Sequence, residues 1–425
     1  MKRMMIALLA LTLLLSTASA EELRLAGSIL LDPEVVSAYA QASGVAIQDA
    51  ESVLSLNEQF AQAMATRDGS VDVYILPTLY GLKNIKRSRF YLPLESSAIL
   101  SEEAELLYPA ILEAVSDQGH LVAWPVSVRP VLRDAREKAR IEGLGLKYPE
   151  TYDEYLDTCA ALMSAEWWRD DRYCINQLHA FDRKHVMAEF IELYIFEQLA
   201  QPDGMISFDT EDFRRLAERI RQEVPAVAAF DPDGTQEELL TMSALAFETI
   251  SERMIPPVCI TVDARPAVDV EMYVAVVNPF SPRAAQAVMF LEYLAQVRDA
   301  GSYTYMRLSP WADERTAAAI AEQEAALEAL RVFLDAEPEN APDIQLKIED
   351  AEMALERLRA SSYVVSPAAL DNYAALAEGF VVPESPELRN DPVIHQLIQM
   401  YVDRTLSIDQ LIFRLEDHVF MVTSE

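Results

Sequence analysis

Between residues 23 and 76, short apolar runs alternate with segments of helical periodicity. The apolar runs predict strands over Leu23–Ala26, Val45–Ile47 and 71–76 (VDVYIL). Helical spacing predicts helices near Pro33–Gln41 and Asn57–Thr66. The order strand, helix, strand, helix, strand is typical of a parallel sheet with helices packed on it, so the pattern predicts an α/β fold.

The residues that follow these strands are the first candidates for ligand binding. In parallel α/β sheets, ligands bind at the carboxyl ends of the strands. Gly27 and Ser28 follow the first predicted strand, and Pro77, which stops the third, precedes Thr78 and Tyr80. We therefore expect Ser28, Thr78 and Tyr80 to face a ligand.

The middle of the chain predicts an extended segment and then several amphipathic helices. HLVAWPVSV, residues 120–128, is extended, and Pro149 and Thr151 open a helix with Glu154 at the capping-box position. Three further helices are predicted. The first covers Val186–Leu199, the second begins after an N-cap at Asp209 or Thr210, and the third covers Glu237–Arg253.

An abrupt change of pattern occurs in YVAVVNPFSPRAAQAVMFLEYLAQ, residues 273–296. We expect Asn278-Pro279 to end a strand, and Ser281 to cap a helix that has Pro282 in its first turn. The helix is predicted to face the sheet with a set of small and aliphatic side chains: Ala284, Val288, Leu291 and Ala295.

Residues 312–360 predict a helical hairpin. Two apolar stripes at helical spacing flank PENAP, residues 338–342. The stripes consist of Ile320, Leu327, Leu330 and Leu334, and of Ile344, Ile348, Ala351, Leu355 and Leu358. The hairpin is either an elaboration packed on a domain or an arm that docks a partner. Helices near 367–378, 392–402 and 407–420, the last with Ser407 as N-cap, complete the chain.

Length and charge bound the class of protein. A chain of 425 residues exceeds one ordinary core and suggests two or more lobes, and 51% hydrophobic residues can fill them. The formal net charge of −34 repels nucleic acid and anionic lipid, so we expect no nucleic-acid partner. The simplest interpretation is a soluble extracytoplasmic protein that its charge keeps dispersed, and we expect it to be a monomer without a cofactor.

The N-terminus has the pattern of a cleavable secretory signal. Lys2 and Arg3 precede an apolar core over Met4–Leu15, and small residues lead to Ala20. Residues 1–20 are therefore expected to be a signal peptide, with export of the rest. The cleavage site has no cysteine for a lipid anchor, and no later run is long enough for a membrane span. Periplasmic location and release remain alternatives.

Three cysteines and two acidic or histidine-containing motifs offer little chemistry. Export would permit a Cys159–Cys174 disulfide, but Cys159 also falls on an apolar helical face and can be a core residue. HAFDRKH (179–185) and AFDPDGT (229–235) lack the spacing of metal sites, so no metal is expected. The sequence contains no G-x-S-x-G, Walker or H-E-x-x-H pattern.

Four segments in collinear order resemble family 1 extracellular solute-binding proteins of ABC importers, the group with maltodextrin-binding proteins. RPAVDVEMYVAVVNPFSPRAAQAVMFLEYLAQ, residues 265–296, is similar to that family's late strand with a "V-N" turn and an A-x-x-F-L-x-Y-L helix. DGSVDVYIL, GHLVAWPVSV and YPETYDEYLDTC resemble three earlier family segments in order and spacing. The likeness covers Leu23 to about Trp311 and the last helices.

The resemblance implies a two-lobed periplasmic-binding-protein fold of type II that holds a solute between its lobes and delivers it to a permease. The first lobe would comprise residues 21–124 and 265–310, and the second 125–264 and 311–425, with the hairpin inserted at 316–360. The missing lipobox cysteine departs from many members of the family. No catalysis is implied.

A sugar-binding site of this kind combines aromatic faces with polar side chains. Candidate aromatic residues are Tyr80, Trp124 and Trp311, and candidate polar residues are Ser28, Thr78, Ser127, Arg129, Asp263 and Arg265. Either arginine could instead select an acidic ligand, so neutral and acidic oligosaccharides both remain possible. The alternatives to a transport protein are a secreted carbohydrate hydrolase with paired carboxylates and a sensor or adhesion subunit of the same fold.

Overall fold

A computed structural model of the chain shows two compact units. Unit 1 comprises Met1–Val126 and Met272–Arg298, and unit 2 comprises Ser127–Glu271 and Asp299–Glu425. The structure describes residues 22–50, 54–78, 82–164, 173–175, 182–201, 205–225, 237–240, 245–246, 250–260, 266–297, 301–312, 314–336, 341–359, 364–383, 388 and 391–424. The predicted signal peptide lies outside these residues, and the predicted lobe boundaries after residues 124, 264 and 310 stay predictions.

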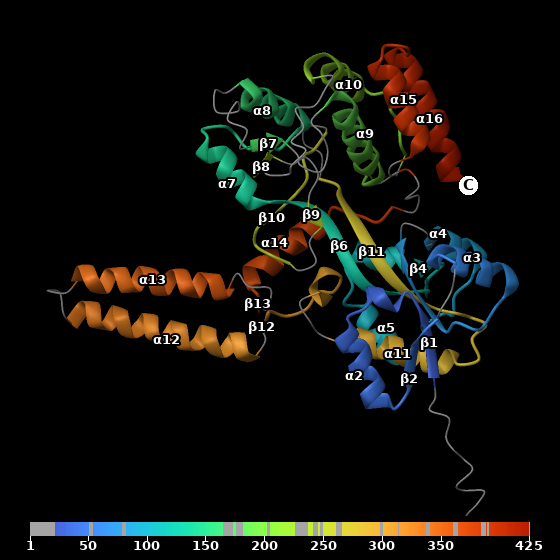
Figure 1. The fold of residues 1–425 in the computed structure, drawn as a ribbon, viewed down its shortest axis with the longest axis horizontal. Helices are drawn as coiled ribbons and strands as arrows, with labels where there is room; N and C mark the ends of the chain where they lie inside the picture. The colour runs from blue at the N-terminus through green and yellow to red at the C-terminus, as the bar shows by residue number, and fades with distance from the viewer. Residues whose placement is uncertain are drawn as a thin grey trace, which may run out of the picture. The chain divides into compact units, whose positions relative to one another are not determined.

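Two long strands carry the chain from one unit to the other. Strand β6 (Trp124–Asp134) begins in unit 1 and ends in unit 2, and β11 (Val268–Val277) runs in the opposite sense between the units. Both are visible as long arrows in Figure 1. The extended segment predicted at 120–128 therefore continues six residues further, and Pro125 lies inside β6.

Unit 1 is built on a mixed sheet in the order β11-β3-β1-β2. Strand β1 (Glu22–Ala26) pairs in parallel with both β2 (Ala46–Asp49) and β3 (Val73–Pro77), as the alternation of strands and helices predicts. Strand β11 is antiparallel to β3, with Tyr273 opposite Pro77. The predicted α/β class is thus confirmed, and Pro77 is the last residue of its strand.

Helices cover both faces of this sheet. The consecutive residues 73–76 of β3 are all buried, which requires cover on both sides because neighbouring side chains point to opposite faces. Phe60 of α3 (Leu56–Thr66) contacts the Tyr74 ring at 5.1 Å between centroids, and Tyr39 of α2 (Pro33–Ser43) contacts Phe290 at 5.0 Å. The remaining elements of unit 1 are α4 (Leu82–Ser88), α5 (Ala98–Ala104), α6 (Pro109–Ala114), β4 (Ser116–Asp117), β5 (His120–Leu121) and α11 (Ala284–Gln296).

The start of α11 differs from the prediction. The helix begins at Ala284, so Arg283 is its N-cap, and Ser281 does not cap it. The Ser281 hydroxyl instead donates to buried Asp72 and accepts from the Arg283 amide. Leu291 and Ala295 are buried as expected, whereas Ala284 and Val288 are only half-buried. The buried face is completed by Ala287, Phe290 and Leu294.

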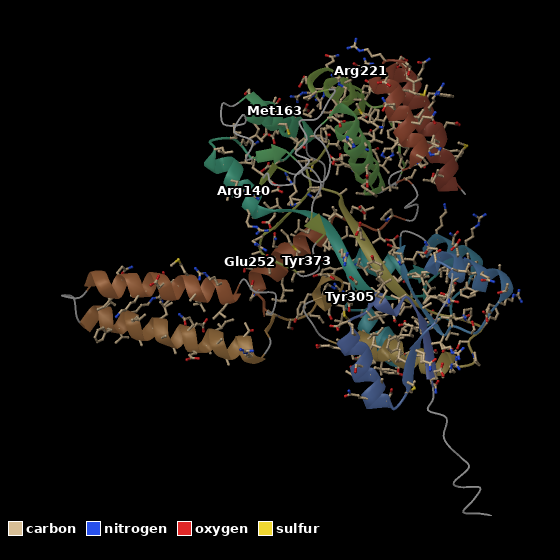
Figure 2. All side chains as sticks on the ribbon, in the orientation of Figure 1. Arg140, Met163, Arg221, Glu252, Tyr305 and Tyr373 are labelled. Atoms are coloured by element: carbon tan, nitrogen blue, oxygen red, sulfur yellow. The ribbon has the colours of Figure 1, made fainter. Side chains whose placement is uncertain are left out.

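Unit 2 is dominated by helices that share one apolar core. These are α8 (Tyr152–Ser164), α9 (Arg183–Leu199), α10 (Glu211–Glu223), α15 (Pro392–Val402) and α16 (Ile408–Ser424). The predicted caps are confirmed at Thr151 with Glu154, at Thr210 and at Ser407. The unit also contains α7 (Ala135–Gly143) and α14 (Pro367–Ala377), where fully buried Tyr373, labelled in Figure 2, donates to the Thr304 carbonyl at 2.7 Å.

The helix predicted over Glu237–Arg253 is wrong. Among its described residues, 237–240 form β8 (Glu237–Leu240), 245–246 form β9 (Leu245–Ala246), and 250–253 are not helical. Strand β10 (Met254–Ile255) follows directly after the segment. Strand β8 pairs in parallel with β7 (Tyr173–Ile175), and β9 and β10 pair antiparallel with β6. The apolar spacing of this segment also suits a helix, but pairing with strands remote in sequence decides its structure.

The predicted helical hairpin is present as α12 (Glu314–Ala336) and α13 (Ala341–Arg359) (Figure 1). Its own apolar cluster contains both predicted stripes except Leu358, which is half-buried. At its base, β12 (Trp311–Ala312) pairs antiparallel with β13 (Val364–Val365). The last short strand, β14 (Phe380–Val381), pairs with the start of β11.

Cys159 is a free thiol in this structure, and the disulfide interpretation is therefore wrong for it. Its side chain lies in the unit 2 core, which is the alternative that its helical face predicts. Burial raises the pKa of this thiol well above its ordinary range.

Candidate ligand-binding site

The end of β1 is shaped by a glycine. Gly27 has φ +83°, and a Cβ at this position would lie 2.5 Å from the Ile75 carbonyl oxygen of β3. No other residue meets both conditions without a shift of the strand. Gly27 thus turns the chain into the short 3-10 helix Ser28–Leu30, directly after the carboxyl end of β1.

Ser28 meets a carboxylate from the neighbouring strand. The Ser28 hydroxyl donates to Asp49 Oδ1, and Asp49 is the last residue of β2. Because β1 and β2 are parallel, their carboxyl ends lie at the same edge of the sheet. Sequence reasoning missed Asp49. It also lies just after a predicted strand, so the rule that selects Ser28 would have selected it.

Thr78 and Tyr273 extend this edge on the other side of β1. Thr78 follows β3 and is buried, and Tyr273 of β11 lies opposite Pro77, with a half-buried side chain. Tyr273 was also missed, and its only sequence signal is its place at the start of the YVAVV run. We refer to Ser28, Asp49, Thr78 and Tyr273 as the carboxyl-edge cluster.

The carboxyl-edge cluster has the chemistry of a site for a polyhydroxylated molecule. Two hydroxyls and a carboxylate can exchange hydrogen bonds with ligand hydroxyls, and a tyrosine ring can cover apolar C–H groups. Ile29, beside Ser28, is 93% exposed and adds apolar surface at the same place. This chemistry suits hydrogen bonding and ring contact rather than charge alone.

The candidates on β6 fall into two environments. Trp124 is fully buried in unit 1, and its indole N–H has no hydrogen-bond partner among the described residues. Ser127 and Arg129 belong to unit 2, are half-buried, and point to the same side of the strand because they are two residues apart. A buried donor without a partner, such as the Trp124 indole N–H, costs the folded state roughly 1–3 kcal/mol.

Four predicted residues cannot be placed as side chains. Tyr80, Asp263 and Arg265 lie outside the described residues, and so do both discarded motifs apart from Asp182–His185 at the end of HAFDRKH. Trp311 opens β12, but its side chain is not described. Of the predicted set, the structure thus brings Ser28 and Thr78 to one sheet edge and Ser127 and Arg129 to one strand face.

The V-N turn that carries the sequence resemblance serves the fold. Asn278 is fully buried; its amide donates to the carbonyls of Asp68 and Val71, each at 2.8 Å, and its Oδ1 accepts from the Phe280 amide. Asp72, also fully buried, accepts from the Arg24 amide at 2.7 Å and from the guanidinium of Arg283 at 3.0 Å. These bonds hold the loop before β3 against the turn after β11.

Within the described residues, no group of three or more histidine, cysteine, aspartate or glutamate side chains is arranged to hold a metal ion. Among the described helices, none combines the length and the apolar character needed to cross a membrane. No protein-family profile and no curated protein matches the chain.

Solved structures of sugar-binding transport proteins resemble the chain over almost its whole length. A cyclic α-maltosyl-1,6-maltose binding protein from Arthrobacter globiformis has a TM-score of 0.54 at 13% identity, covering 94% of this chain and 98% of its own. Maltose-bound MalE3 of T. maritima has a TM-score of 0.52 at 12% identity, covering 95% and 100%. The ABC transporter associated binding protein from B. animalis subsp. lactis Bl-04, in complex with β-1,6-galactobiose, has a TM-score of 0.52 at 13% identity, covering 94% and 97%. The chain therefore has the two-lobed α/β fold of ABC-transporter solute-binding proteins.

Proposed function

We propose that this chain is an extracytoplasmic solute-binding protein that captures a carbohydrate and delivers it to the permease of an ABC importer. The observation that carries the proposal is the match of nearly the whole chain to proteins whose structures hold maltose or β-1,6-galactobiose. The signal-peptide pattern of residues 1–20 supports export of the mature chain. We infer that it acts as a monomer and needs no cofactor.

The carboxyl-edge cluster is our first choice for the ligand contacts in unit 1. Its hydroxyls, carboxylate and aromatic ring suit a neutral sugar, and Asp49 would repel an anionic one. Ser127 and Arg129 on β6 are the candidates in unit 2, together with Asp263, Arg265, Tyr80, Trp124 and Trp311 as sequence predictions. A sugar acid would require that an arginine outweigh Asp49, so we favour a neutral oligosaccharide.

A thermal-shift screen of the mature chain, residues 21–425, tests the function. The probes are maltose, β-1,6-galactobiose and other mono- and oligosaccharides, with amino acids and polyamines as further classes. A ligand at one hundred times its Kd stabilises the folded chain by about 2.7 kcal/mol. We expect at least one neutral sugar to raise the melting temperature and none to be hydrolysed.

Two substitutions then test the carboxyl-edge cluster. Thr78→Ala removes a hydrogen bond, and Asp49→Asn replaces a charge-assisted acceptor with a neutral amide. Each should weaken the best sugar about tenfold, which corresponds to about 1.4 kcal/mol. Thr66→Ala, on an exposed turn of α3, is the matched control and should leave Kd unchanged. Equal Kd values for all three variants would exclude this cluster as the contact surface.

The competing functions predict different results in the same assays. A secreted hydrolase would release product from a glycan, which loss of paired carboxylates would stop. A sensor or adhesion subunit would bind a protein partner without supporting solute uptake. The absence of any sugar-induced shift, combined with glycan turnover, would overturn the transport proposal.

A further inference from the structure

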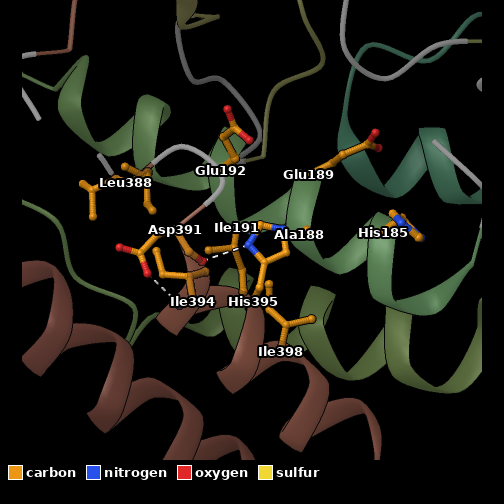
Figure 3. A pocket seen from close by; sticks show the side chains of 11 residues that line it. His185, Ala188, Glu189, Ile191, Glu192, Leu388, Asp391, Ile394, His395 and Ile398 are labelled. Atoms are coloured by element: carbon orange, nitrogen blue, oxygen red, sulfur yellow. Dashed lines mark hydrogen bonds between the residues drawn. The ribbon is translucent and has the colours of Figure 1, made fainter. Parts of the chain in front are cut away.

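A cavity between α9 and α15 in unit 2 has aliphatic walls, and its polar side chains are already engaged. The Asp391 carboxylate accepts from His418 and from two α15 amides, and His395 Nδ1 lies 2.8 Å from the Asp391 backbone oxygen. Figure 3 shows the carboxylates of Glu189 and Glu192 directed away from this space. The cavity therefore indicates no particular ligand, whereas the surface of unit 1 carries a concentration of positive charge.

Helix α4 and the residues after it form a basic segment in an acidic protein. Aspartate and glutamate make up 69 of the 425 residues, yet residues 73–94 contain neither. The same stretch contains Lys83, Lys86, Arg87 and Arg89, and both arginines are exposed. In a chain of net charge −34, such a segment attracts anionic groups to one place on the surface.

A further positive charge joins this segment from α3. Arg67 follows the last residue of α3 directly and is exposed. The last turns of α3 and α4 are in contact, because Ser88 Oγ lies 3.4 Å from Met64 Sδ. Figure 1 shows the two helices next to each other in unit 1. The fold therefore gathers the positive charges of both helix ends on one surface.

An exposed aromatic ring lies between the two helix ends. The guanidinium carbon of Arg67 lies 5.8 Å from the centre of the Phe280 ring, which belongs to a residue that is 42% exposed. Phe90, the residue after Arg89, contacts the same ring at 5.9 Å between centroids. We refer to Arg67, Lys86, Arg87, Arg89 and Phe280 as the basic face.

The basic face lies at the opposite edge of the sheet from the carboxyl-edge cluster. Arg67 precedes β3, and Phe280 follows β11, whose last residue, Val277, is paired with Val73 at the start of β3. The carboxyl-edge cluster instead contains Thr78, which follows the end of β3. A molecule on the basic face would therefore leave the proposed sugar contacts uncovered.

We propose that the basic face docks an acidic segment of a partner protein. Its carboxylates accept charge-assisted, bidentate hydrogen bonds from the arginines, and an apolar side chain between them contacts Phe280. A protein segment fits this face better than an anionic membrane, because a flat bilayer would also meet the acidic surface around it. The net charge of −34 likewise opposes a second copy of the chain as the occupant.

Fluorescence-anisotropy titrations of the mature chain with two labelled heptapeptides test the charge requirement. One peptide has a phenylalanine between two runs of three glutamates, and the other has glutamines in place of the glutamates. At about 0.1 M salt, the glutamate peptide should bind about tenfold more tightly than the glutamine peptide, and higher salt should reduce this difference. Equal affinities, or no binding of the glutamate peptide, would overturn the proposal.

Two double variants of equal charge place the peptide on the basic face. Arg67→Glu with Arg89→Glu replaces two attractions by two repulsions and should weaken the glutamate peptide about tenfold. Arg404→Glu with Arg414→Glu is the matched control, since both arginines are exposed in unit 2 and Arg404 has the same positive φ as Arg67 and Arg89. The control should change Kd by less than about twofold, and equal effects of the two double variants would contradict the proposed face.

Glycine at the same two positions separates loss of charge from loss of fold. Arg67 and Arg89 have φ of 57° and 53°, a region that glycine adopts more readily than arginine. Arg67→Gly with Arg89→Gly should therefore weaken the glutamate peptide several-fold without lowering the melting temperature. If the glutamate substitutions unfold the chain, this variant decides, and an unchanged peptide affinity in it would contradict the proposal.

The remaining measurements separate the basic face from other occupants and from the proposed function. Phosphatidylglycerol vesicles should not sediment with the chain, and sedimentation velocity should detect no self-association. Vesicle binding or self-association that Arg67→Glu with Arg89→Glu abolishes would assign the face to lipid or to a second copy and overturn the proposal. Sugar-induced thermal shifts should be the same in all variants, so that a wild type without sugar binding would contradict only the proposed function.

Discussion

Single residues hold the two ends of the unit 1 sheet in place. At the carboxyl end, Gly27 permits a close approach to Ile75 that any Cβ would prevent. At the other end, Asn278 and Asp72 are buried polar side chains whose hydrogen-bonding groups all have partners in the loop and turn they connect. Buried polar groups are stable only when they are satisfied in this way.

The Asn278 contacts predict a large loss of stability on truncation. Asn278→Ala removes three hydrogen bonds, among them the buried one to the Val71 carbonyl, so we expect a loss of about 3 kcal/mol in the free energy of unfolding. Urea denaturation measures it. Asn84→Ala, on the exposed side of α4, should change the free energy by less than about 0.5 kcal/mol. Similar values for both variants would contradict the role of the turn.

A second residue, Asp391, links stability to pH. The residue is 7% exposed, and its carboxylate accepts from His418 Nε2 at 2.9 Å and caps α15 by accepting from two amides. Burial raises the pKa of Asp391, but the hydrogen bonds from His418 and from the α15 amides lower it more, so this pKa lies below its ordinary value. The folded state therefore favours the carboxylate. Its contribution is complete above the ordinary aspartate pKa of about 3.9 and is lost as the pH falls through the lower folded value.

Asp391→Asn tests this linkage, because asparagine keeps the helix cap and removes only the charge. We expect the variant to be about 1.5 kcal/mol less stable than wild type near pH 6, and the difference to shrink as the pH falls from the ordinary aspartate pKa through the lower folded value. Chemical denaturation across this range measures it. The same substitution at Asp32, the exposed N-cap of α2, should give a smaller difference at every pH. A difference at Asp391 that is independent of pH would show that its charge is not the cause.

At the scale of elements, the sequence predicts an element correctly where the residues that stabilise it are neighbours in sequence. The capping box at Thr151 and Glu154 and the paired stripes of the hairpin involve neighbours in sequence, and the structure contains both. The segment 237–253 shows the opposite case. Its strands β8 and β9 pair with Tyr173–Ile175 and with Val131–Leu132, which no local spacing reveals.

The hairpin α12–α13 should be removable as one element. Its apolar cluster consists of hairpin residues alone, and at its base Ala312 is paired directly with Val364. An Asn-Gly turn can join residues paired in this way, so it can replace residues 313–363. We expect the shortened chain to keep its sugar affinity, with a melting temperature within about 4 °C of the full chain.

Uptake and pull-down assays with the shortened chain then distinguish the two interpretations of the hairpin. An elaboration of unit 2 predicts normal solute uptake and an unchanged set of bound partners. A docking arm predicts normal sugar binding with loss of a partner. Aggregation or loss of sugar binding would contradict the independence of the hairpin.

At the scale of the whole molecule, acidity and architecture have separate roles. The net charge of −34 disfavours nucleic-acid binding and association between copies of the chain, but it selects no ligand. The ligand chemistry that we propose for unit 1 comes from the carboxyl-edge cluster, a small set of side chains that the fold assembles. This set lies inside one unit, so its geometry follows from that unit alone.

The sequence by itself determined the α/β class, most helix boundaries, the hairpin and the resemblance to solute-binding proteins. These features depend on spacing, caps and turns within about twenty residues, and such local patterns can be recognised in the sequence alone. Only the tertiary structure decided that Asp49 and Tyr273 join Ser28 and Thr78, that 237–240 and 245–246 form strands, and that Ser281 binds Asp72. Those results depend on contacts between residues twenty to two hundred positions apart, and a linear pattern carries no information on which distant partner a strand or a polar side chain will meet.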